Sequence, residues 1–79
     1  MTQAEARNII KTCIAPNAVG LYNAGDIIMV QHVMAHFDRN PYEVLNEMST
    51  CGYLEYRVAT ELSVAGWRLT ELGAQIANM

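Results

Sequence analysis

The sequence predicts a single small α+β domain that is mostly helical. Apolar residues recur at helical spacing in three segments of the first 50 residues, and beyond residue 52 the spacing changes to the alternation of a strand. The length of 79 residues is enough for one hydrophobic core only. With 52% hydrophobic and 16% charged residues, the chain is too apolar to be a disordered segment.

The first predicted helix begins after Thr2, because a Thr followed three residues later by Glu5 forms a capping box. Its buried face is expected at Ala6, Ile9, Ile10, Cys13 and Ile14. Pro16 and Gly20 end this helix and open an irregular connection over 15–25. We expect Val19, Leu21 and Tyr22 to cover that connection.

The second predicted helix has Asp26 as its N-cap and runs to about His36. Five apolar residues fall within one arc of the helical wheel and are expected to be buried: Ile27, Val30, Val33, Met34 and Phe37. Gln31, His32 and His36 are expected to face solvent.

The third predicted helix has the strongest start signal in the chain. Asn40 is a good N-cap, Pro41 presets the backbone of the first turn, and Glu43 follows at the third position. The helix runs to about Thr50, and Gly52 is expected in a left-handed conformation just beyond it. The buried stripe is Val44, Leu45 and Met48, and the outward face is Tyr42, Glu43, Asn46 and Glu47, with Thr50 at its margin.

A β-hairpin and a last helix complete the prediction. Leu54, Tyr56 and Val58 alternate with Tyr53, Glu55 and Arg57, and a second strand covers 66–69 beyond a tip at 59–65. Trp67 is expected in the core, where it would anchor the hairpin against the first helix. Thr70 caps the last helix, with Leu72, Ile76 and Met79 on its apolar face.

Two segments resemble known regulators. Met48–Leu54 is similar to the end of a recognition helix that passes through Gly into a wing strand. Gly66–Gly73, with its Leu-Thr-x-x-Gly, resembles the second wing strand and last-helix entry of MarR-type and DeoR-type winged helix-turn-helix proteins. The resemblance spans about Asp26 to Ile76. It implies one domain over 1–79, with three helices, a two-stranded wing and a C-terminal helix: the helix-turn-helix at about 26–50, the wing at about 53–69 and the last helix at about 70–79.

The resemblance implies a DNA-binding transcriptional regulator that forms a dimer through its first and last helices. In such relatives the third helix enters the major groove and the wing contacts the backbone. Carried over, this places Tyr42, Glu43, Asn46 and Glu47 toward bases, and Arg39, Arg57 and Arg68 toward phosphates, with Asn40 at the start of the helix.

The charge distribution favours a different ligand. The formal net charge is −3, and the charged residues from 38 to 55 are one arginine against four carboxylates: Asp38, Arg39, Glu43, Glu47 and Glu55. Phosphate contacts normally require Lys or Arg. The alternative is a protein-binding adaptor or inhibitor, for example from a phage or other mobile element. It would dock through Glu43, Glu47 and Tyr42 on a basic partner, including one that itself binds nucleic acid.

The hairpin tip and an excess of apolar residues also favour a protein-binding function. The tip sequence Thr60–Val64 contains no Lys or Arg. Five further apolar residues exceed what so small a core can hold, so some of them should form an exposed interaction patch: Ile28, Met29, Tyr42, Leu62 and Val64.

No catalytic, cofactor or membrane-spanning pattern is present, so we expect a cytoplasmic protein that is not an enzyme. Cys13 and Cys51 belong to no Cys-x-x-Cys pair and are interpreted as buried thiols. His32 and His36 are spaced to share a metal with Asp38, but two solvent-facing histidines are the simpler interpretation.

Overall fold

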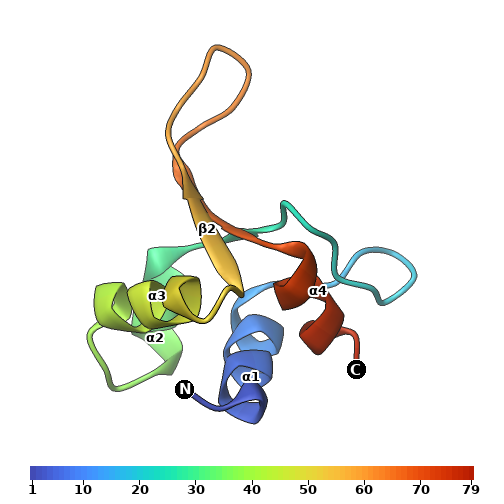
Figure 1. The fold of residues 1–79 in the computed structure, drawn as a ribbon, viewed down its shortest axis with the longest axis vertical. Helices are drawn as coiled ribbons and strands as arrows, with labels where there is room; N and C mark the ends of the chain where they lie inside the picture. Colours follow the sequence, from blue (N-terminus) through green and yellow to red (C-terminus); the bar gives the residue numbers. More distant parts are fainter.

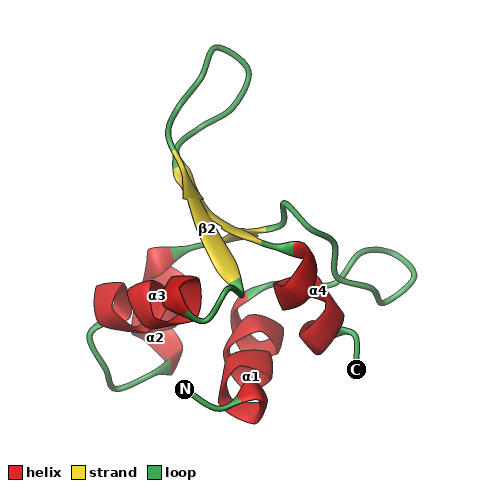
Figure 2. Cartoon of the chain, viewed as in Figure 1, coloured by secondary structure: helices red, strands yellow, loops and turns green.

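Four helices and three strands make up the computed structural model, which describes residues 1–79 (Figures 1 and 2). In chain order these are α1 (Gln3–Cys13), β1 (Ile27–Ile28), α2 (Val30–His36), α3 (Pro41–Thr50), β2 (Leu54–Arg57), β3 (Gly66–Leu69) and α4 (Glu71–Ala77). The helices gather at one end of a three-stranded antiparallel sheet, and the β2–β3 hairpin projects away from them (Figure 1). No helix is long and apolar enough to cross a lipid bilayer.

Three of the helices begin at the predicted caps. The Thr2 hydroxyl accepts from the Glu5 amide at 3.1 Å, and the Thr70 hydroxyl accepts from the Gly73 amide at 3.1 Å. The Asn40 side chain accepts from the amides of Tyr42 and Glu43 at 3.0 and 3.3 Å. These are local interactions, and each satisfies an amide that the first turn of a helix would otherwise leave unpaired.

The prediction for the second helix was wrong at its start. Ile27 and Ile28 form strand β1, and α2 begins only at Val30, after an N-cap residue, Met29, that makes no side-chain capping bond. Asp26 instead closes a turn, where its carboxylate accepts from the Asn23 amide at 2.9 Å. A short apolar run fits a strand as well as a helix, and here pairing with a distant strand decides.

The sheet has three strands in the order β1-β3-β2, whereas a two-stranded hairpin was predicted. The registers pair Ile28 and Tyr56 with Trp67 from either side, and Leu54 with Leu69. Because directly paired residues share a face, these five side chains lie on the inner face, toward the helices. The outer face carries Ile27, Glu55, Arg57 and Arg68.

The core is one cluster of 16 buried residues to which every helix contributes. The predicted buried faces of α1 and α3 are confirmed, as is the outward face of α3. Elsewhere the predicted buried sets were partly wrong. Ile27 lies in β1 instead of a helix, and Tyr56 and Val58 lie where the hairpin extends beyond the helices. The apolar residues that are exposed instead of buried are Val19, Leu21, Ile27, Met34, Tyr56, Val58, Leu72 and Met79.

A close backbone approach determines which face of α4 is buried. Gly73 packs directly against the Tyr53 carbonyl, which leaves no room for a Cβ atom at this position. The same carbonyl accepts from the Thr70 amide at 3.1 Å, and the Thr70 hydroxyl donates to the Gly52 carbonyl at 2.5 Å. Gly52 has the predicted left-handed backbone, with φ of 86°. The turn after α3 therefore holds the first turn of α4.

We expect Gly73→Ala to lower the free energy of unfolding by about 1–3 kcal/mol, the usual cost of overpacking a filled site. The added methyl would displace the Tyr53 carbonyl, and this cost exceeds the gain in helix propensity. Urea denaturation followed by circular dichroism measures it. Gly66→Ala is the matched control, because nothing lies within 4 Å of its added Cβ. Equal stability of the two variants would contradict the close approach.

Candidate binding surface

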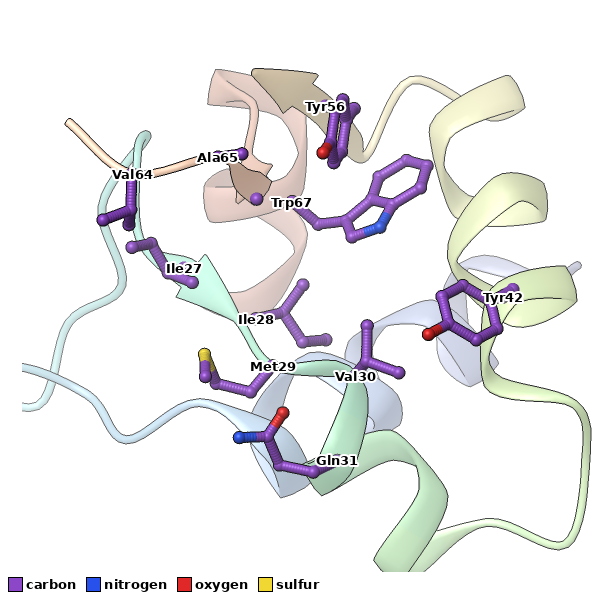
Figure 3. Close-up of a pocket in the computed structure, with 11 residues that line it drawn as sticks. Ile27, Ile28, Met29, Val30, Gln31, Tyr42, Tyr56, Val64, Ala65 and Trp67 are labelled. Carbon is purple, nitrogen blue, oxygen red and sulfur yellow. The ribbon is translucent and has the colours of Figure 1, made fainter. Parts of the chain in front are cut away.

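An apolar pocket of about 330 Å³ lies where the inner face of the sheet passes beyond the helices (Figure 3). Of its 11 lining residues, nine are hydrophobic, so it is suited to apolar groups. They come from the β1–α2 junction, the first turn of α3 and the hairpin: Ile27–Gln31, Tyr42, Tyr56 and Val64–Trp67.

The pocket follows from the length of the hairpin. At its base the Leu54–Leu69 pair is fully covered by the helices. At the next inward-facing pair, Tyr56 is 54% exposed and its ring meets the Trp67 ring edge-on, with centroids 5.3 Å apart. Trp67 is only half-buried and lines the pocket, whereas the sequence predicted a core anchor against the first helix. The inner face thus continues past the core without a cover.

Most of the predicted apolar surplus is exposed around this pocket. Met29, Tyr42 and Val64 are exposed and line it, while Ile28 is only 1% exposed and lies at its base. Leu62, at the hairpin tip, is 98% exposed. Figure 3 shows Tyr42 and Val30 on one side of the hollow and Met29 and Ile27 on another. Three of the five surplus residues, Met29, Tyr42 and Val64, are therefore exposed together at the pocket.

Two of the three arginines assigned to phosphate contacts form ion pairs within the chain. Arg39 lies 3.6 Å from Glu47 and Arg57 lies 2.5 Å from Glu55, and all four side chains are substantially exposed. Exposed pairs of this kind contribute little to stability, but each neutralises the charge that an anionic ligand would meet.

Arg68 is engaged inside the molecule. Its guanidinium donates to the Gly25 carbonyl at 3.3 Å, to the Ser63 hydroxyl at 3.0 Å and to the Val64 carbonyl at 3.2 Å. The Nε atom is buried and has no hydrogen-bond partner. Arg68 therefore ties the hairpin tip to the loop before β1, rather than projecting outward from the strand.

The acidic side chains of the same region have fewer partners. From residue 38 to residue 68, three charged residues form neither an ion pair nor a side-chain hydrogen bond, and all three are acidic: Asp38, Glu43 and Glu61. Glu43 directly follows Tyr42 of the pocket, and Glu61 is at the tip. The charged groups of this region without any partner are thus all negative, while Arg68 is hydrogen-bonded but keeps a charge that no carboxylate pairs.

The remaining candidate residues lie on α3. Tyr42, Glu43 and Asn46 are exposed and Glu47 is half-exposed, so the four occupy one outward face, as predicted. The side chain of Asn40 is used as the cap of this helix. Met29 was among the apolar residues expected in an exposed patch, whereas Tyr56 and Trp67 were not predicted as site residues. Tyr56 lies two residues after Leu54, and Trp67 lies two residues before Leu69. Because residues two apart in a strand share a face, this spacing indicated that the four side chains lie on one face of the hairpin.

The cysteines and histidines are not gathered in one cluster. No three His, Cys, Asp or Glu side chains lie close enough to hold a metal ion. The Nδ1 atom of His32 lies 3.3 Å from the Cys13 carbonyl oxygen. Cys13 is buried, and this burial raises the pKa of its thiol. Cys51 is exposed, contrary to the prediction, because it is the cap residue at the end of α3.

Comparison with known proteins gives no relative for this chain: no family model, no curated protein and no solved structure matches it.

We expect the two thiols to react at very different rates. At pH 8, Cys51 should react rapidly with a chromogenic disulfide reagent, whereas Cys13 is shielded and, because its pKa is raised, carries less thiolate. Cys51→Ser should therefore remove the fast phase and leave a thiol that reacts only after denaturation. Two fast thiols in the native protein would contradict the burial of Cys13.

We expect Arg68→Gln to loosen the hairpin tip. Loss of the three hydrogen bonds should speed thermolysin cleavage within 58–65 by roughly tenfold, which corresponds to about 1.4 kcal/mol of tip stability. Arg57→Gln is the matched control, because it removes only an exposed pair with Glu55. Mass spectrometry of the early fragments identifies the cleavage site. Similar rates for both variants would show that Arg68 does not hold the tip.

Proposed function

We propose that this chain is a winged helix-turn-helix domain that acts by binding another protein, and that this partner presents a basic, apolar surface. The fold assignment is supported by α2 and α3, which pack together across a connection of residues 37–40 and lead directly into the hairpin. In this interpretation α3 is the recognition helix and the β2–β3 hairpin is the wing.

The observation that carries the proposal is the combination of an apolar pocket with carboxylates that have no partner at Glu43 and Glu61. Monomeric proteins rarely expose a contiguous apolar patch, and such a patch rimmed by polar groups marks an interaction site. Glu43 next to Tyr42, and Glu61 at the tip, would attract Lys or Arg around an apolar anchor of the partner. An adaptor fits this description, and so does an inhibitor that covers a nucleic-acid-binding surface.

Electrostatics argue against DNA as the main ligand. Duplex binding draws its non-specific affinity from Lys and Arg that neutralise phosphates. Arg39 and Arg57 are already paired with carboxylates, and Arg68 is bonded to the body of the domain. A duplex placed against α3 would meet Glu43 without any free cation beside it.

A DNA-binding transcriptional regulator remains the second candidate. The observation that favours it is the exposed position of Asn46 on the outward face of α3, because an Asn side chain can form two hydrogen bonds with adenine. Dimerisation through α1 and α4, which such regulators use, remains a prediction. The two helices pack against each other within one chain.

Charge substitutions on α3 distinguish the two candidates. Affinity capture from the native host, with and without nuclease, should recover a specific protein that survives nuclease. Glu43→Gln and Glu47→Gln should each weaken that complex several-fold and reduce its salt dependence, because attraction to the partner's cations is lost.

Glu5→Gln is the matched control, since it removes the same charge from an exposed position on α1. Fluorescence anisotropy with a random duplex forms the second arm. If DNA is the ligand, the α3 variants should bind the duplex more tightly and the protein complex should be absent after nuclease treatment. That result would overturn the proposal.

A further inference from the structure

Beside the pocket, one edge of the β2–β3 hairpin has no strand paired with it. Strand β1 pairs with β3 only at Arg68 and Trp67, because the chain turns into α2 at Val30. Strand β2 pairs with β3 over its whole length, to Gly66. One edge of the hairpin is therefore open from Gly66 toward the tip, on the side where β1 would have continued (Figure 1).

The direction of the backbone groups along this edge follows from the bonds already made. Leu69 donates to the Asp26 carbonyl and accepts from the Gly25 amide, both at 2.8 Å, so its N–H and C=O face the β1 side. In an antiparallel sheet, alternate residues of a strand face the same neighbour, which places Trp67 on that side as well. Ala65 directly precedes β3, and the same alternation continued one residue beyond Gly66 brings Ala65 to that side. The N–H and C=O of Ala65 form no hydrogen bond within the chain.

The open edge and the pocket are parts of one surface. Ala65 is itself a lining residue, and Figure 3 shows it between Val64 and Trp67 at the margin of the hollow. The strand that carries it is held in place, because Arg68 donates to the Val64 carbonyl and to the Ser63 hydroxyl. A ligand would therefore meet an edge that is already ordered, which lowers the entropic cost of binding.

We infer that the partner binds through an extended segment that continues β1 along this edge and hydrogen-bonds to both backbone groups of Ala65. One large apolar side chain of the segment enters the pocket over Trp67, and flanking Lys or Arg residues face Glu43 and Glu61. Strand addition of this kind takes its affinity from main-chain hydrogen bonds and its specificity from side-chain pockets. The inference rests on the proposed protein-binding function and specifies its mode.

The acidic side chains of this surface favour a basic partner segment over a second copy of the chain. The most exposed large apolar side chain that another copy can offer is Leu62, in the tip Thr60–Val64, which carries Glu61 and no cation. That segment would bring a carboxylate toward Glu43 and Glu61 of the first copy, and like charges brought together at an interface are unfavourable. A cationic extended segment would instead bring opposite charges toward Glu43 and Glu61.

Random linear peptides displayed on phage are the first probe, selected on the purified chain. We expect the enriched peptides to share one Leu, Phe or Trp with Lys or Arg close by. Their synthetic forms should change the fluorescence of Trp67, which is the only tryptophan. Enrichment of acidic peptides, or of none, would overturn the inference, and so would self-association of the free chain through the tip.

Backbone substitutions test the strand-like mode. Ala65→Pro removes the N–H group and should weaken the selected peptide at least tenfold, whereas Ala65→Gly keeps that group and should bind nearly as well as the native chain. Ala59→Pro is the matched control, because Ala59 lies in the same hairpin and its amide also makes no hydrogen bond. Thermal unfolding should be alike for the two proline variants.

A second measurement leaves the protein unchanged. N-methylation of the peptide at successive positions should abolish binding at the residue that donates to the Ala65 carbonyl and have little effect at the neighbouring residues. If Ala65→Pro and N-methylation have no effect while Glu43→Gln and Tyr42→Ala weaken binding, the partner uses the pocket without adding a strand. The inference then fails and the proposed function stands. If no peptide binds and a duplex does, both fail.

Discussion

Strand β3 is hydrogen-bonded along both of its edges, and the other elements take their positions from it. On one edge it holds β2, and through β2 the end of α3. On the other edge it holds β1, and so fixes where α2 can begin. At its end Leu69 leads into Thr70, whose amide and hydroxyl bind the turn at Gly52 and Tyr53. The open edge beside the pocket exists because β3 is paired for longer on one edge than on the other.

Local interactions made part of this fold predictable. The caps at Thr2, Asn40 and Thr70 involve residues within a few positions of one another, so a sequence pattern can contain the whole interaction. Strand β1 was missed for the opposite reason. The run Ile27–Val30 carries no information about Trp67 and Arg68, which are about 40 residues away and decide that its first half is a strand.

The candidate site was predictable to a similar degree. The acidic face of α3 followed from helical spacing, because the charges of Glu43 and Glu47 and their direction are both local properties. The hydrogen bonds and ion pairs formed by the arginines were not predictable. Arg68 bonds to Gly25, Ser63 and Val64 because the three-stranded sheet places them within its reach. The pocket likewise required knowing how far the hairpin extends past the helices.

The brevity of β1 also has a consequence for the order in which the molecule folds. Strand β1 is only two residues long, and its partner β3 follows it in the chain by roughly 40 residues. Contacts between distant parts of a chain form slowly, because a long loop must close before they yield any stabilisation. Helix α1 can therefore form early, while Ile27, Ile28 and Met29 stay exposed until β3 arrives. During that interval this apolar run is open to chaperones and to aggregation.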